Sequence, residues 1–79
     1  MLLGTVEGNL WATKKESRLV GQTFLMVRLN YSDRTLICAD CVGAGKGELV
    51  LIATGAAARV ATGREIPVDA AVVGIVDTV

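Results

Sequence analysis

Two cysteines and a run of alternating glycines are the residues of this chain whose types and spacing could support chemistry. Cys38 and Cys41 form a C-x-x-C pair, and the glycines follow it. A redox C-x-x-C lies at a helix N-terminus in a βαβ unit, whereas this pair runs from an apolar segment into a turn. The pair supplies only two of the four ligands of a structural zinc, and the chain has no histidine. We therefore favour two reduced cysteines that act as small buried apolar side chains over a metal site shared between subunits.

The glycine-rich turn, Gly43 to Gly47, contains Lys46 and so has a superficial likeness to a phosphate-binding loop. A P-loop needs four residues between its first glycine and Gly-Lys, followed by Ser or Thr and a long helix. Here Glu48 follows Gly47, and an apolar run typical of a strand comes next. We therefore predict no bound nucleotide and no cofactor. The glycines are interpreted as positions of positive φ or of close backbone approach.

Acid–base catalysis in this chain would depend on carboxylates or a tuned lysine, because histidine is absent. Four acidic residues stand at predicted strand ends or turns, where carboxylates commonly accept backbone N–H bonds: Asp40, Glu48, Asp69 and Asp77. We predict that these residues shape local structure. We therefore expect no catalytic residues and predict that the protein is not an enzyme.

The apolar runs that position these residues predict several short strands and one helix of about two turns. Gly4 and Gly8 lie inside the first strand, where a curved sheet would bend. Thr54 is expected to cap the helix and Gly63 to end it. The expected fold is a single small all-β domain over residues 1–79, a five-stranded OB-like β-barrel with one short α-helix between the last two strands. The predicted strands cover residues 2–13, 24–29, 35–39, 49–53 and 71–79, and a polar loop covers 14–17.

The composition indicates burial between subunits. Of the 79 residues, 52% are hydrophobic, and the mean hydropathy is +0.52, high for so small a domain. The strand segments 24–27, 49–53 and 72–76 do not alternate apolar and polar residues. We therefore expect one side of each strand to face the barrel and the other a neighbouring subunit. No apolar run reaches the ~20 residues that span a membrane, and no secretory signal is recognised, so a cytosolic protein without a membrane partner is expected.

The charges argue against nucleic acid as a partner. Eight basic and eight acidic residues give a net charge of zero, and the three aromatic residues offer little surface for stacking bases. Lys14, Lys15 and Arg18 form a basic cluster that Glu16 interrupts, which we interpret as a solvated loop. Trp11 is either a core anchor or a subunit contact, and the sequence leaves both open.

Two segments of the chain resemble the signature of the EutN/CcmL family, the pentameric vertex proteins of bacterial microcompartment shells. One is Asp-Cys-Val-Gly-Ala-Gly-Lys-Gly-Glu-Leu-Val at 40–50, and the other is Pro-Val-Asp-Ala-Ala-Val-Val-Gly-Ile-Val-Asp at 67–77. Residues 1–14 are similar to the family's first strand. The resemblance implies a structural protein of a microcompartment shell in the cytoplasm. It implies homopentamers that cap icosahedral vertices and contact hexameric and pseudohexameric shell proteins.

The resemblance also implies roles for particular residues. The structural turn would comprise Asp40, Gly43, Gly45, Gly47 and Glu48; a five-fold axis or pore would involve Gly55, Ala56 and Ala57; and the closing strand would make contacts through Pro67, Asp69 and Gly74. Family members commonly have Gly-Ser-Ser-Ala-Arg where this chain has Gly-Ala-Ala-Ala-Arg, so a pore here would be less polar. The turn at 30–34 is also shorter than the family's loop.

One competing function, from the class of binding modules, is an OB-like module that captures an oligonucleotide or a small ligand. Such a module needs a strand face that carries aromatic and basic residues, and the sequence shows none. The sequence leaves open whether the compartment is a carboxysome or a metabolosome.

Overall fold

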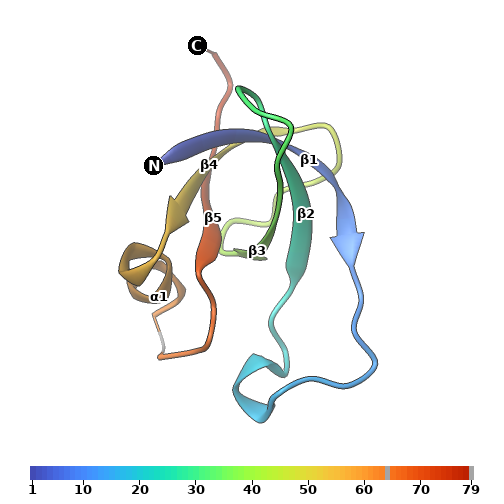
Figure 1. The fold of residues 1–79 in the computed structure, drawn as a ribbon, viewed down its shortest axis with the longest axis vertical. Helices are drawn as coiled ribbons and strands as arrows, with labels where there is room; N and C mark the ends of the chain where they lie inside the picture. The colour runs from blue at the N-terminus through green and yellow to red at the C-terminus, as the bar shows by residue number, and fades with distance from the viewer. Residues whose placement is uncertain (64, 79) are drawn as a thin grey trace.

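The computed structural model describes residues 1–63 and 65–78, which form a closed five-stranded barrel with one short helix beside it (Figure 1). The strands are β1 (Leu2–Leu10), β2 (Phe24–Leu29), β3 (Thr35–Asp40), β4 (Leu49–Thr54) and β5 (Ala70–Ile75). They pair in the order β1-β2-β3-β5-β4, and β4 returns to β1. The β3–β5 pairing is parallel and the others are antiparallel. The prediction of a small OB-like barrel is confirmed.

Some predicted strand borders are wrong because pairing partners run out. β1 ends at Leu10, before the predicted end at residue 13, since Leu10 pairs with Phe24, the first residue of β2. The last strand begins at Ala70 and ends at Ile75, and Val76 adds one more bond from its N–H to the Leu49 carbonyl at 2.8 Å. Because β4 begins at Leu49, β5 has no further pairing partner in β4 beyond this bond. Residue 79, the predicted end of this strand, lies outside the described residues.

The loop between β1 and β2 contains a short 3₁₀ helix, η1 (Ser17–Leu19), that the sequence did not indicate. Glu16 caps this helix by accepting a bond from the Arg18 backbone N–H at 2.7 Å and another from Arg18 Nε at 2.7 Å. These bonds lower the pKa of the Glu16 carboxyl. The interpretation of this segment as an exposed loop holds apart from the helical turn.

The barrel interior is filled by apolar side chains, among which seven are fully buried: Val6, Leu25, Val27, Cys38, Val50, Ile52 and Val72. Gly4 makes this packing possible, because a Cβ at residue 4 would lie 2.6 Å from Val27 Cγ1 and 2.9 Å from the Arg28 carbonyl oxygen. Gly4 therefore allows β1 to approach β2 closely. Gly8 has the predicted bending role, since the β1–β2 register shifts between Val6 and Gly8.

The helix α1 (Ala56–Thr62) packs on the outside of the barrel beside β4 and β5 (Figure 1). Ala58 is fully buried there in a second apolar cluster with Ala39, Ile66, Val68 and Ala71. Thr54 was wrong as the helix cap, because it remains in β4 and Gly55 takes the N-cap position with φ 63° and no side-chain cap. Gly63 ends the helix in the left-handed conformation, φ 71°, as predicted.

Candidate functional site

The glycine turn is built around the half-buried carboxylate of Asp40 at the end of β3. Its Oδ1 accepts bonds from the backbone N–H groups of Val42 at 3.1 Å and Gly43 at 3.0 Å. Its Oδ2 accepts the Ala44 N–H at 3.1 Å. This confirms the prediction that the acidic residue shapes the turn, since one side chain satisfies three backbone donors that no strand pairs.

The glycines of this turn have different functions. Gly43 and Gly47 have φ values of 78° and 89°, which residues with a Cβ adopt only with strain. Gly45 was expected to behave in the same way, but its φ is not positive. A Cβ there would meet only the Glu48 Oε1 atom at 3.5 Å, an ordinary contact. The Gly45 N–H donates to that same carboxylate oxygen at 2.7 Å, so Glu48 closes the turn from its far end.

The turn is hydrogen-bonded to β1 and contributes one side chain to the barrel core. The Gly47 N–H donates to the Val6 carbonyl at 2.8 Å, and the Val6 N–H donates to the Glu48 carbonyl at 3.0 Å. Ala44 lies inside the turn and packs in the barrel core, with 8% of its surface exposed. These contacts give the turn a structural role, while Lys46 remains exposed.

We expect Asp40→Ala to lower the free energy of unfolding by about 2 kcal/mol. A hydrogen bond to a charged group contributes about 1.5–3 kcal/mol, and the part-buried bond to the Ala44 N–H is lost in full, whereas water can replace the acceptor at the exposed bonds to Val42 and Gly43. Urea denaturation measures this change. The control Lys46→Ala should stay within about 0.5 kcal/mol of the parent protein, as expected for an exposed side chain. The opposite ranking would contradict the structural interpretation of the turn.

The two cysteines lie in different environments, which corrects half of the prediction. Cys38 is fully buried in the barrel, where burial and, to a lesser extent, the Asp69 charge raise its thiol pKa to about 11. Cys41 was expected to be buried too, but it is exposed, and its Sγ lies 3.7 Å from the Ala61 carbonyl oxygen. The error arises because Cys41 follows the end of β3 and lies outside the barrel. Both thiols are free, and within residues 1–63 and 65–78 no three Cys, Asp or Glu residues gather as a metal site would require.

The remaining predicted site residues lie around α1 and β5. Gly55 and Asp69 are brought together, since the Gly55 N–H donates to the Asp69 carbonyl at 2.8 Å, and both line a hollow of about 620 Å³ beside the start of β3. Asp69 therefore acts here through its backbone. Ala56 and Ala57 are exposed on α1, Pro67 is exposed in the segment before β5, and Gly74 is half-buried in β5. Their proximity to a five-fold axis or a neighbouring subunit stays a prediction.

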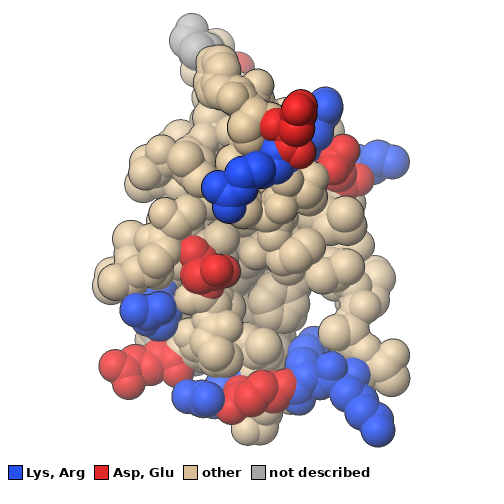
Figure 2. All heavy atoms as spheres, viewed as in Figure 1, with Lys and Arg blue, Asp and Glu red and all other residues tan. Residues whose placement is uncertain are grey.

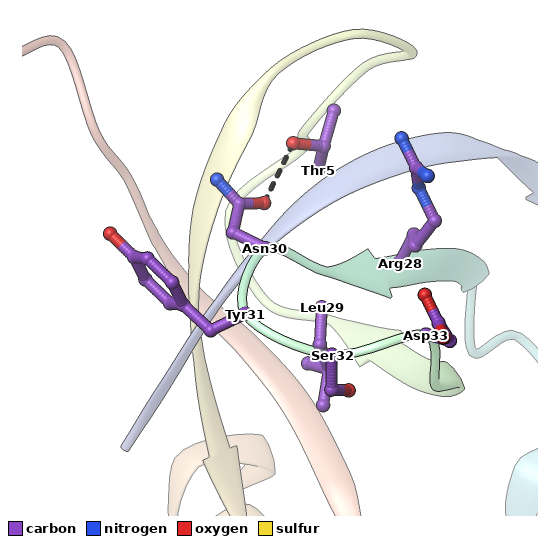
Figure 3. Close-up of a pocket in the computed structure, with 7 residues that line it drawn as sticks. All are labelled: Thr5, Arg28, Leu29, Asn30, Tyr31, Ser32 and Asp33. Atoms are coloured by element: carbon purple, nitrogen blue, oxygen red, sulfur yellow. Dashed lines mark hydrogen bonds between the residues drawn. The ribbon is translucent and has the colours of Figure 1, made fainter.

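Among residues 1–63 and 65–78, the hollows and surface charges do not have the character of an oligonucleotide or cofactor site. A hollow of about 560 Å³ at the β2–β3 turn is lined by Thr5, Arg28, Leu29, Asn30, Tyr31, Ser32 and Asp33 (Figure 3). In this hollow a side-chain hydrogen bond joins Thr5 to Asn30 at 3.0 Å; Thr5 is half-buried and Asn30 is exposed. Among the described residues no buried side-chain nitrogen or oxygen lacks a hydrogen-bond partner. Figure 2 shows basic and acidic side chains intermingled on the face it displays. None of the helices in the described part of the chain is long and apolar enough to cross a membrane.

Sequence patterns did not predict that Trp11 and Tyr31 are each 85% exposed. The exposure of Trp11 excludes its predicted alternative as a core anchor. No local pattern marks the two as surface residues, because large aromatic side chains are usually buried at least in part.

The match to known proteins covers almost the whole chain. A family model described as "Ethanolamine utilisation protein EutN/carboxysome" matches residues 1–77. The chain belongs to the EutN/CcmL family. Its relatives include the microcompartment shell vertex protein GrpN of Rhodospirillum rubrum, 45% identical with 100% of this chain and 96% of GrpN covered. The carboxysome shell vertex protein CcmL of Thermosynechococcus vestitus is 41% identical, with 100% and 86% covered.

The fold agrees equally well with solved members of this EutN/CcmL family. The structure described as the pentameric microcompartment shell protein GrpN from Rhodospirillum rubrum superimposes with a TM-score of 0.91 and 40% identity, covering 100% of this chain and 96% of that one. The names of these relatives describe structural shell proteins, in agreement with the prediction that the chain is not an enzyme.

Proposed function

We propose that this chain is a vertex protein of a bacterial microcompartment shell, which assembles as a homopentamer and occupies the five-fold positions of the shell. The observation that carries this proposal is the match over residues 1–77 together with the TM-score of 0.91 to a shell protein described as pentameric. The structural character of the glycine turn and the intermingled surface charge support it further.

The mechanism of a vertex protein is geometric. Hexagonal tiles form flat sheets, and a closed shell needs five-fold positions to introduce curvature. A ring of five identical subunits has heterologous contacts that close after five rotations. We propose that the edges of this pentamer contact hexameric and pseudohexameric shell proteins, which matches the partners expected from the resemblance.

The assembly state tests the proposal most directly. Light scattering coupled to size-exclusion chromatography should give a mass of about 41 kDa, five times the 8.2 kDa of one chain. Association is expected because a single copy leaves large apolar side chains exposed, including Trp11, Val60 and Ile37. The number five follows the solved relative described as pentameric. A monomer that persists at micromolar concentration would refute the vertex function.

The competing function, an OB-like module for an oligonucleotide or a small ligand, finds no support in the geometry. The interior of the barrel is occupied by its own apolar side chains. The outer side of β2 carries Phe24, Met26 and Arg28, but Phe24 packs against the second apolar cluster and Arg28 Nε lies 4.0 Å from Glu7 Oε2. This single aromatic and single basic residue do not form the row on which bases stack. The names of the relatives also describe shell components.

A further inference from the structure

The first half of β3 has an open backbone edge. In an antiparallel ladder, residues that bond to the neighbouring strand alternate with residues whose backbone N–H and C=O groups point the other way. The Asp40 N–H donates to the Thr23 carbonyl at 2.9 Å, so the even-numbered residues of β3 bond toward β2. Thr35 and Ile37 therefore direct their backbone groups to the opposite edge of the strand.

The neighbouring strand β5 does not reach this edge. The parallel ladder between the two strands pairs residues 39–40 of β3 with residues 71–72 of β5 and extends no further. Within residues 1–63 and 65–78, no group bonds to the outward N–H or C=O of Thr35 or Ile37. Unpaired backbone groups at a strand edge are a template for pairing with another chain.

The hollow of about 620 Å³ lies along this open edge. Residues 34–37 form one wall, and the residues before and after the β4–α1 junction and at the start of β5 form the other: Thr54, Gly55, Asp69 and Ala70. Its volume is within the range of about 300–1,000 Å³ that is common for ligand sites. Residues 34–37 span about 13 Å at about 3.3 Å per residue, so the edge can pair with about four residues of an extended chain.

The side chains around the hollow indicate what an added strand would carry. Leu36 is half-buried and packs against the barrel core, and Leu2 lines the same hollow. A residue that pairs with Leu36 in an added strand has its side chain on the same side of the sheet. An apolar side chain is therefore expected at that position.

Opposite charges stand at the two ends of the hollow. Arg34 immediately precedes β3, and Asp69 immediately precedes β5, near the point where β3 and β5 meet. The Asp69 charge helps to raise the pKa of the Cys38 thiol, in agreement with a carboxylate near that end. Within the described part of the chain, Arg34 and Asp69 are exposed and take part in no ion pair. A chain with an amino group at Asp69 and an acidic side chain at Arg34 would complement both charges.

We propose that the open edge of β3 binds the extended N-terminal segment of another polypeptide, which adds as a short antiparallel strand. The α-amino group lies at Asp69, the second residue is apolar and lies beside Leu36, and the fourth residue is acidic and lies opposite Arg34. The segment begins at Asp69 because the β3–β5 ladder leaves no edge to pair with beyond this end. In this mode of recognition, main-chain hydrogen bonds provide affinity and alternate side chains provide specificity.

A synthetic peptide tests the site on the full chain in the assembly that it adopts. The probe is Ala-Val-Thr-Glu-Ser with a free amino group and an amidated carboxyl end. Titration of the ¹⁵N-labelled protein should shift the amide signals of Thr35 and Ile37, and their hydrogen exchange should slow because both N–H groups gain an acceptor. Exchange at Leu36, whose N–H is directed toward β2, is the internal control and should not change.

Two altered peptides separate the backbone bonds from the charge. Ala-Val-Pro-Glu-Ser lacks the N–H of its third residue, which pairs with Thr35, and should bind at least about tenfold more weakly. The acetylated form of the probe loses the positive charge at Asp69. It should bind about fivefold more weakly, the upper end of the effect of an exposed ion pair.

Matched variants of the protein test the same bonds from the other side. Thr35→Pro removes one outward N–H at the first residue of β3, a position where a strand tolerates proline, and should weaken binding about tenfold. Thr35→Val keeps the N–H and should bind as the parent protein does. Asp69→Asn keeps the backbone bond to Gly55 and should weaken the free-amine probe about fivefold while leaving the acetylated form unchanged.

The outcomes are independent of the proposed function, because the mass of the parent protein tests the ring and the peptide tests the edge. A pentameric protein that does not bind the probe at millimolar concentration overturns the site alone. Slow exchange at Thr35 and Ile37 without peptide would show that another copy of the chain covers the edge, and would also overturn it. Equal binding of the probe and its proline form would overturn strand addition.

Discussion

Deletion of the gene for this chain is expected to leave microcompartment shells unclosed while the enclosed enzymes remain active. The proposed vertex protein adds no chemistry, so its loss removes five-fold curvature and nothing else. Sheets of hexagonal tiles without five-fold positions should grow as tubes or elongated bodies. Electron microscopy of the deletion strain shows this directly. Normal polyhedral shells, in a strain that encodes no second vertex protein, would refute the assignment.

Complementation of the deletion strain sharpens this test. The Lys46→Ala variant changes an exposed residue of the glycine turn and should restore closed shells. A variant that folds but stays monomeric should reproduce the deletion, because the curvature comes from the ring and not from the single chain. Closed shells built with a monomeric variant would show that the pentamer is not the active form.

Among the Gly→Ala substitutions in the described residues, Gly4→Ala is expected to destabilise the barrel most. The added Cβ would lie 2.6 Å from Val27 Cγ1 and 2.9 Å from the Arg28 carbonyl oxygen. Val27 is fully buried, and the Arg28 carbonyl belongs to a paired strand, so neither can withdraw without moving β2 away from β1. Overpacking of this kind costs about 3 kcal/mol. That is a large part of the stability of a small domain, and Gly4→Val should prevent folding.

Gly45→Ala is the matched control for this substitution. Its φ is not positive and the added Cβ would make one ordinary contact at 3.5 Å, so the free energy of unfolding should change by less than about 1 kcal/mol. Chemical denaturation of the parent and both variants gives the comparison. Equal denaturation midpoints for Gly4→Ala and the parent protein would contradict the close packing of β1 on β2.

The strands and the turn could be predicted because their signals are local. The apolar runs at 24–29 and 49–53 match the observed β2 and most of β4, and Gly63 ends the helix as expected. Asp40 before a glycine-rich turn correctly indicated a carboxylate that binds backbone N–H groups. The helix cap was wrong because Thr54 has a better use as the last residue of β4, paired with Ala70. The propensity of a threonine to cap a helix does not show whether the same residue will instead be used in strand pairing.

Sequence patterns by themselves determined the strands, the helix α1, the barrel class and the family, because apolar runs, glycine positions and motif spacing are properties of neighbouring residues. Tertiary structure alone decided the environments that depend on which strands become neighbours. It placed Cys38 inside the barrel and Cys41 outside, and it exposed Trp11. It also showed that Gly4 is required for close packing, whereas Gly45 is not strained. The order β1-β2-β3-β5-β4 is likewise encoded by no short stretch of sequence, because it arises from pairings between residues far apart in the chain.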